Sequence, residues 1–121
     1  MKKILIIGLV FVLVTGVAFA QRFNNGNFTG QGTSYNAATS TGNGSITVQV
    51  TIRGNRITDI AVTNYTDSSM FLNMAMATMR PALLNARTPE AVMAVDTVSG
   101  ATYTARGIRE AVAAAMTQAR R

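Results

Sequence analysis

Residues 46–63 contain the pattern that most restricts how this chain can fold. The first eight, beginning at Ile46, alternate strictly between apolar and polar, which is the period of a β-strand with one buried face. The following Gly54-Asn55 pair suits a tight two-residue turn, because such turns require positive φ angles. The returning segment, Arg56–Thr63, is less regular in the spacing of its apolar residues, which predicts a bulge near the turn. We therefore predict an antiparallel hairpin at the centre of the fold.

Two longer segments with helical spacing follow the hairpin. Residues 67–86 place apolar side chains every three or four positions, and the segment after Thr104 does the same. Pro81 is expected to kink or divide the first helix, because proline lacks an amide hydrogen and crowds the preceding turn. The methionines of that helix indicate core packing, with a soft metal-binding or partner-binding surface as the alternative. Thr88-Pro89-Glu90 predicts a short helical turn between the two helices.

The predicted fold class is therefore α+β. A small antiparallel sheet is built on the central hairpin, and two main helices pack against one of its faces. Phe28–Gly32 is expected to be a further strand, and Met93–Val98 is another candidate strand. Residues 35–44 are predicted to be a flexible loop, because their small polar side chains cannot supply a buried face.

The first twenty residues have the pattern of a secretory signal peptide (1–20), which leaves a single domain at 21–121. Lys2 and Lys3 precede an apolar run, and Ala18-Phe19-Ala20 offers the small-x-small pattern of a signal peptidase site. The apolar run is shorter than the roughly 20 residues of a membrane span. An uncleaved membrane anchor is the alternative. The domain is expected to be exported, to the periplasm or the extracellular space.

Composition excludes several kinds of chemistry. The chain has no His and no Cys, which excludes zinc fingers, thiol nucleophiles, disulfide bonds and an imidazole base. Five carboxylates leave little for a cage of hard oxygen ligands, so we expect no metal site. The formal net charge of +6 comes from scattered basic residues without interleaved aromatics, which does not indicate a nucleic-acid surface. We therefore expect any reactive group to come from a cofactor.

Residues 96–104 concentrate small and hydroxyl-bearing side chains directly before the last helix. Such a segment suits a phosphate group, because a helix N-terminus offers unpaired amide hydrogens and a positive potential. The alternative is ordinary capping, in which Thr102 or Thr104 caps the helix and Gly100 turns the chain. The spacing alone leaves both interpretations open.

The nine residues Asp96-Thr97-Val98-Ser99-Gly100-Ala101-Thr102-Tyr103-Thr104 resemble the flavinylation signature of the FMN-binding domain family. That family includes the FMN-carrying subunits of the sodium-pumping NADH:quinone reductase and of the Rnf complex. Its signature reads Asp, two variable positions, Ser-Gly-Ala-Thr, one variable position and then Ser or Thr, and every fixed position is met. Phe28-Thr29-Gly30 and the hairpin are similar to the family's first strand and its strand–turn–strand unit.

The resemblance implies that FMN is joined to Thr104 through a phosphoester. A separate magnesium-dependent flavin transferase would move the FMN part of FAD onto this hydroxyl. The implied function is an exported electron carrier rather than a stand-alone enzyme, with no catalytic residues of its own. Its redox donor and acceptor are unidentified, and a membrane reductase is one candidate. The cofactor-binding positions that the resemblance implies are Thr104, Asp96, Ser99, Gly100, Ala101 and Thr102.

One segment departs from the family pattern. The family often carries a Glu-Thr-Pro-Gly-like segment on the flavin side of the site, whereas this chain has Asn64–Ser69 there, with neither that Glu nor the Pro-Gly. Tyr65 and Phe71 are candidates to stack on the flavin ring, with a core position as the alternative for each. The alternative function is an exported binding or surface-interaction module of the same fold, which holds flavin non-covalently or not at all.

Overall fold

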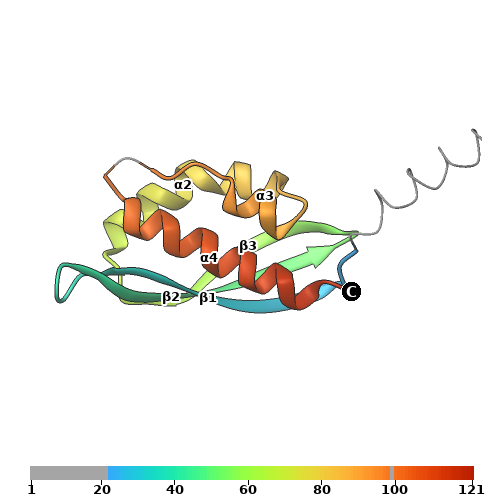
Figure 1. Ribbon diagram of the computed structural model, residues 1–121, viewed down its shortest axis with the longest axis horizontal. Helices are drawn as coiled ribbons and strands as arrows, with labels where there is room; N and C mark the ends of the chain where they lie inside the picture. The colour runs from blue at the N-terminus through green and yellow to red at the C-terminus, as the bar shows by residue number, and fades with distance from the viewer. Residues whose placement is uncertain (1–21, 99) are drawn as a thin grey trace, which may run out of the picture.

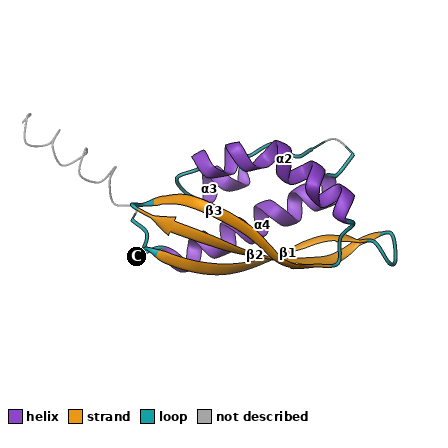
Figure 2. Cartoon of the chain, turned by 180° about the vertical axis from the view of Figure 1, so that it is seen from behind, coloured by secondary structure: helices purple, strands orange, loops and turns teal. Residues whose placement is uncertain are grey.

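The computed structural model describes residues 22–98 and 100–121, and it forms a three-stranded antiparallel sheet with helices on one side (Figures 1 and 2). The predicted signal peptide and Ser99 lie outside the described residues. The predicted α+β class is confirmed, with α2 and α4 as the two main helices. The elements in chain order are β1 (Gly26–Asn36), β2 (Thr41–Arg53), β3 (Arg56–Tyr65), α2 (Ser69–Asn85), α3 (Pro89–Met93) and α4 (Thr102–Ala119).

β2 and β3 form the predicted central hairpin. Gly54 and Asn55 make its turn with φ angles of 61° and 68°, which is the left-handed conformation that this kind of turn requires. The pairing register shifts between Thr51 and Ile52, directly before the turn. This shift confirms the predicted bulge.

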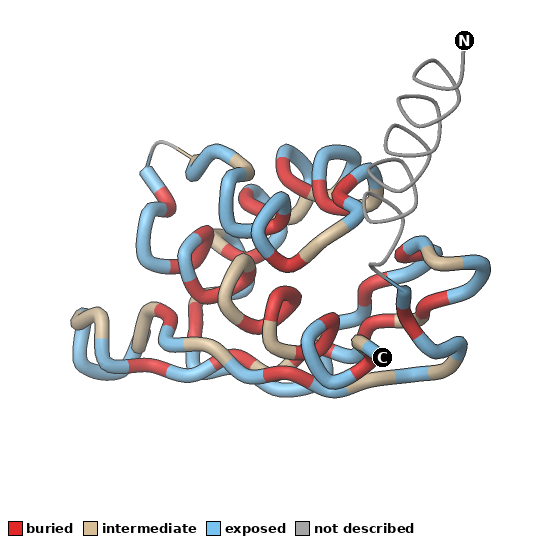
Figure 3. The backbone as a smooth tube through the Cα atoms, turned by 45° about the vertical axis from the view of Figure 1, so that its right-hand side comes forward, coloured by how far each residue is buried: buried red, intermediate tan, exposed pale blue. Residues whose placement is uncertain are grey.

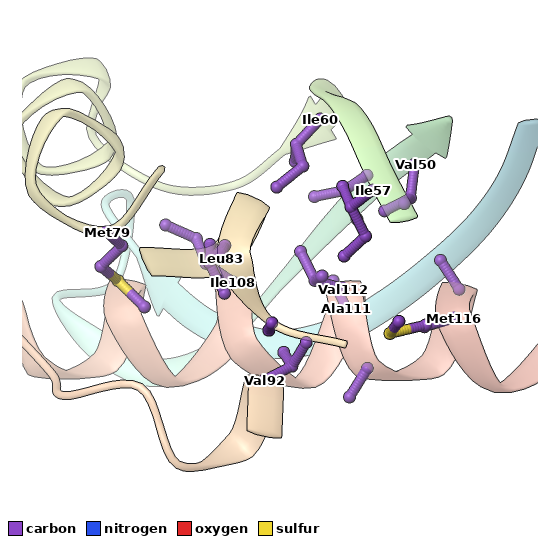
Figure 4. Close-up of a cluster of buried hydrophobic side chains, with 14 of the residues drawn as sticks. Val50, Ile57, Ile60, Met79, Leu83, Val92, Ile108, Ala111, Val112 and Met116 are labelled. Atoms are coloured by element: carbon purple, nitrogen blue, oxygen red, sulfur yellow. The ribbon is translucent and has the colours of Figure 1, made fainter. Parts of the chain in front are cut away.

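The helices cover one face of the sheet, and the other face is exposed (Figures 2 and 3). Alternate residues of β2 from Ile46 to Ile52 have no exposed surface, while those between them are exposed or half-buried. The strand alternation predicted from the sequence is therefore what divides the sheet into a core face and a solvent face. Side chains from α2, α3 and α4 complete the core, among them Met79, Leu83, Val92, Ile108 and Met116 (Figure 4).

A second hairpin occupies most of residues 35–44, which were predicted to be a flexible loop. β1 continues to Asn36, a four-residue turn follows, and β2 begins at Thr41. The prediction was wrong because the small residues allow two backbones to approach closely. A Cβ atom on Gly44 would lie only 2.2 Å from the carbonyl oxygen of Tyr35. Small side chains here therefore serve strand packing and not flexibility.

α4 lies directly on β1 because glycines remove the side chains that would separate them. A Cβ atom on Gly30 would lie 2.0 Å from the carbonyl oxygen of Ala111, and one on Gly32 would lie 2.3 Å from that of Gly107. On the helix side, a Cβ atom on Gly107 would lie 2.6 Å from the Cβ of Ser34. None of these positions leaves room for a methyl group, so the contact depends on glycine.

α2 is one continuous helix whose N-cap is Ser68. Pro81 was expected to kink or divide this helix; it lies inside the continuous helix, so the division does not occur. Met79 is buried in the core, whereas Met70 and Met74 are 69% and 39% exposed. The interpretation of the methionines as core residues therefore holds for only part of the helix.

Residues 93–98 do not form a strand, although they were a candidate for one. α3 is the predicted short helical turn; Thr88 is its N-cap, it ends at Met93, and a loop follows. The carbonyl oxygens of Met93 and Val95 accept hydrogen bonds from Nη1 of Arg109, at 3.1 and 3.0 Å. An arginine side chain on α4 thus bonds carbonyl groups that a neighbouring strand would otherwise bond.

The two ends of the described chain are joined by backbone hydrogen bonds. The amide of Asn24 donates to the carbonyl oxygen of Ala119 at 2.8 Å, and the amide of Arg121 donates to that of Arg22 at 2.9 Å. The C-terminal end of α4 is therefore fixed beside the start of β1. Its N-terminal end lies at the opposite end of the molecule (Figure 1).

The close contact between α4 and β1 gives a test of the fold. Gly30→Ala would force a methyl group into the backbone of α4. We therefore expect the free energy of unfolding to fall by about 1–3 kcal/mol or more. Urea denaturation followed by far-UV circular dichroism would measure it. Thr29→Ala, on the exposed side of the same strand, is the control and should change the stability by less than about 1 kcal/mol. Equal effects of the two substitutions would contradict the described contact.

Candidate functional site

Residues 100–104 form the junction between the preceding loop and α4. Gly100 has a φ angle of 85°, and Ala101 occupies the N-cap position. The N-cap of α4 makes no side-chain hydrogen bond. The capping interpretation of Thr102 and Thr104 was therefore wrong, because both residues lie within the first turn. Their hydroxyl groups are available for other contacts, and the start of the helix has no side-chain cap.

The structure places the predicted site residues in different environments. Thr104 is 1% exposed and Ala101 is also buried, whereas Gly100, Thr102 and Asp96 are exposed. The first four of these lie around one pocket, and Asp96 is not among the residues that line it. Ser99 lies outside the described residues. The predicted segment is therefore brought together at the start of α4, with Asp96 set apart from the pocket.

A buried hydrogen-bond network surrounds the hydroxyl of Thr104. Thr104 Oγ1 donates to Oδ2 of Asp67 at 2.7 Å, and Ser34 Oγ donates to the same oxygen at 2.6 Å. The amide of Ser68 donates to the other carboxylate oxygen, Oδ1, at 2.8 Å. Ser34 and Asp67 are 0% and 7% exposed. One buried carboxylate thus connects β1, the segment before α2, and the first turn of α4.

The pocket beside this network is open to solvent and has a volume of about 210 Å³. One side of it comes from residues 100–104, and the remaining walls are aromatic. The lining residues are Tyr35, Phe71, Gly100, Ala101, Thr102, Tyr103 and Thr104. A pocket with aromatic walls and a hydroxyl on its surface suits a planar ligand that also carries a polar group.

Three aromatic rings are arranged around the pocket. Tyr35 meets Phe71 edge to face with their ring centroids 5.3 Å apart, and it is stacked with Tyr103 at 6.5 Å. The guanidinium carbon of Arg106 lies 5.4 Å from the centroid of the Tyr103 ring. Tyr103 is 47% exposed, so one aromatic wall of the pocket stands at the protein surface.

Sequence reasoning identified Thr104 but missed most of the residues around it. Tyr35 lies in a segment that was predicted to be a loop, and Ser34 was not predicted to line a site. Tyr103 belongs to the predicted hydroxyl-rich segment but was not among the cofactor-binding positions. Tyr65 is 41% exposed and does not line the pocket, whereas Phe71, the other candidate for stacking, does. Asp67 belongs to the segment that departs from the family pattern, yet it places a carboxylate on Thr104. The one signal in the sequence that could have pointed to Asp67 was that it is the only acidic residue of that segment.

The described residues offer few other features that would suit a ligand. Within residues 22–98 and 100–121, no three His, Cys, Asp or Glu side chains are grouped so that they could hold a metal ion. No helix in this part of the chain is long and apolar enough to cross a membrane. The pocket itself offers hydroxyl groups and aromatic rings, and the adjoining network adds the carboxylate of Asp67.

The network predicts that the Thr104 hydroxyl stabilises the fold in the absence of any ligand. Thr104→Val keeps the shape of the side chain but removes a hydrogen bond to a buried carboxylate, so the free energy of unfolding should fall by about 1–3 kcal/mol. Urea denaturation of flavin-free protein would measure the change. Thr102→Val is the matched control, because Thr102 is exposed in the same helical turn, and it should have little effect. A Thr104→Val protein as stable as the wild type would show that the bond contributes nothing.

Comparison with known proteins agrees with this pocket. No curated protein matches the chain. The FMN-binding domain model matches residues 42–117, a region that contains the central hairpin, α2, α3 and most of α4. Asp67, Phe71 and Thr104 lie within the match, whereas Ser34 and Tyr35 precede it. Because the match covers more than half of the sequence, the chain belongs to the FMN-binding domain family.

Proposed function

We propose that this protein is an exported electron carrier that holds FMN through a phosphoester bond to Thr104. Family membership supports FMN as the cofactor. The observation that carries the covalent part of the proposal is the position of Thr104. Its side chain lies on the wall of an aromatic pocket, in the first turn of a helix that has no side-chain cap.

The start of α4 fits the phosphate group of FMN. A phosphodiester on Thr104 would carry one negative charge, which the positive end of the helix dipole and the first amide hydrogens stabilise. Gly100, which precedes the N-cap residue, has open space where a side chain would stand, since no described residue beyond its chain neighbours comes within 4 Å of the point that a Cβ atom would occupy. This open space beside the first turn of α4 supports a phosphate group at the junction.

The aromatic walls fit the flavin ring. Tyr35, Phe71 and Tyr103 offer apolar faces and edges against which a planar, conjugated ring can stack. The pocket is open on one side, so a ring seated there keeps an exposed edge. An exposed edge supports the proposed function, because electrons must pass between the flavin and other proteins.

The division of work between cofactor and protein supports a carrier rather than a stand-alone enzyme. FMN supplies the redox chemistry when bound, and the protein contributes anchoring, orientation and electrostatics. The chain contains no His or Cys that could serve as a proton-transferring or nucleophilic group beside the flavin. We therefore assign no catalytic residue for substrate conversion.

Maturation and location complete the proposal. A separate magnesium-dependent flavin transferase would attach FMN, with residues 96–104 as the segment that it recognises. The signal-like residues 1–20 support export to the periplasm or the extracellular space. A covalent bond suits such a location, because flavin that dissociates there is lost. A membrane reductase is the proposed class of redox partner, and no role in nucleic-acid binding is proposed.

Covalent flavinylation at Thr104 is tested by co-expression with a flavin transferase. The wild-type protein should fluoresce in a denaturing gel, and its intact mass should increase by that of FMN less one water. Thr104→Ala should lose both signals because the acceptor oxygen is absent. Thr104→Ser is the matched control and should remain labelled, since serine keeps the hydroxyl. A labelled Thr104→Ala protein would assign the attachment to another residue.

Burial of Thr104 favours one alternative, in which the same pocket holds FMN without a covalent bond. The hydroxyl is 1% exposed and is already hydrogen-bonded to Asp67. Intact mass under denaturing conditions separates the two functions. A protein that binds FMN in its native state but shows no added mass after co-expression would support the non-covalent alternative.

The aromatic walls predict the fluorescence of the bound flavin. Stacking against tyrosine quenches flavin emission, so loaded wild-type protein should brighten when it is denatured. Tyr35→Leu should reduce this gain, because leucine fills similar space without an aromatic ring. Emission of the native and denatured loaded proteins, at equal flavin absorbance, measures the effect. Tyr65→Leu is the control and should behave like the wild type, because Tyr65 does not line the pocket.

A further inference from the structure

Asp67 is placed to take the proton from the hydroxyl that is proposed to carry FMN. Thr104 Oγ1 donates a hydrogen bond to Asp67 Oδ2 over 2.7 Å, within the range for transfer to a general base. A threonine hydroxyl is a weak nucleophile until a base removes its proton. We propose that Asp67 is the general base for flavin transfer onto Thr104, an inference that rests on the proposed function.

The carboxylate is held in a fixed orientation. Ser34 Oγ donates to the same Oδ2 at 2.6 Å, and the Ser68 amide donates to Oδ1 at 2.8 Å. Ser34 is itself held against α4, since there is no space for a methyl group between it and Gly107. Bonds from β1 and from the N-cap residue of α2 therefore hold the carboxylate with Oδ2 toward Thr104. A base held in this way does not have to be reoriented before the reaction.

The charge of Asp67 is not shared with a basic side chain in the described part of the chain. The ion pairs found there join Arg80 to Asp59 and Arg120 to Glu90. The contacts of Asp67 come instead from two hydroxyl groups and one amide, which are neutral donors. No guanidinium or ammonium group of the described residues is therefore paired with Oδ2, and the oxygen faces the hydroxyl whose proton it would accept.

The transfer step balances with Asp67 as the proton acceptor. Thr104 Oγ1 forms a bond to the phosphorus atom in the FMN half of FAD. The bond from that phosphorus to the bridging oxygen breaks, and AMP leaves with the electron pair of the broken bond. The hydroxyl proton passes to Asp67 Oδ2 and from there to the leaving phosphate or to solvent. FAD is the co-substrate that the transferase brings to the reaction, and no oxidant or reductant is needed.

Asp67 is preferred over Asp96, the acidic residue of the signature. Asp96 is exposed and does not line the pocket, whereas Asp67 is buried and bonded directly to the acceptor oxygen. This contrast separates two roles: Asp96 is positioned to be read by the transferase, and Asp67 is positioned to act on the hydroxyl. The two roles predict different kinetic effects.

The experiment measures the rate of label incorporation into the full chain with purified transferase, Mg²⁺ and saturating FAD, over a range of transferase concentrations that extends to saturation. Asp67→Asn should slow the maximal rate by about 100-fold or more, the usual contribution of a general base. Asp96→Asn should mainly raise the transferase concentration needed for half-maximal rate. An Asp67→Asn rate within about threefold of the wild type would overturn the assignment.

A pair of equally sized substitutions separates chemistry from folding. Asp67→Glu and Asp67→Gln disturb the buried site to a similar extent, but only the glutamate can accept the proton. We expect Glu to be labelled much faster than Gln, and equal rates would also overturn the proposal. Thermal unfolding of each variant identifies any that fail to fold. If the wild type and Thr104→Ser are themselves not labelled, the proposed covalent function fails, whatever the Asp67 variants do.

Discussion

The contact between α4 and β1 is the constraint on which the rest of the structure depends. Glycines at positions 30, 32 and 107 let the helix backbone rest on the strand backbone. Gly107 lies one turn beyond Thr104 and packs directly against Ser34. The contact that closes the core therefore also fixes the distance between the first turn of α4 and β1 at the site. Side chains larger than hydrogen at these positions would lift α4 and separate Thr104 from the carboxylate that it shares with Ser34.

Local patterns made the elements predictable, and long-range contacts hid the site. The hairpin around Gly54 and the helix after Thr104 follow from periodicity within a few residues, so sequence reasoning found both. The first hairpin was missed because its small polar residues look like a linker unless the strand beside them is known. Thr104 was found through a nine-residue signature, but its partner Asp67 lies 37 residues away and has no local signal of that pairing. Residues joined only by folding, such as Ser34 and Tyr35, could not be placed from the sequence.

Burial of the acceptor hydroxyl has two opposing effects on the proposed chemistry. A dry, oriented hydroxyl beside a carboxylate is well prepared for transfer, because few rearrangements separate it from the reacting geometry. The same burial means that the transferase must reach an atom that the folded protein covers. A phosphoester on Thr104 would leave this residue with no proton to donate, and Asp67 would keep only its bonds from Ser34 and Ser68. The interactions that connect β1 with α4 would therefore differ between the protein without FMN and the protein that carries it.

The backbone hydrogen bonds between the two ends of the described chain hold both ends at the side of the molecule opposite the pocket. α4 has 18 residues and is therefore about 27 Å long, and it runs from the pocket to the end where Arg22 and Arg121 meet (Figure 1). A segment attached at either terminus thus leaves from the pole opposite the pocket. If such a segment were tethered to a surface, the described ends of the domain would lie nearest that surface. The pocket would then lie on the far side of the domain, where other molecules can reach it.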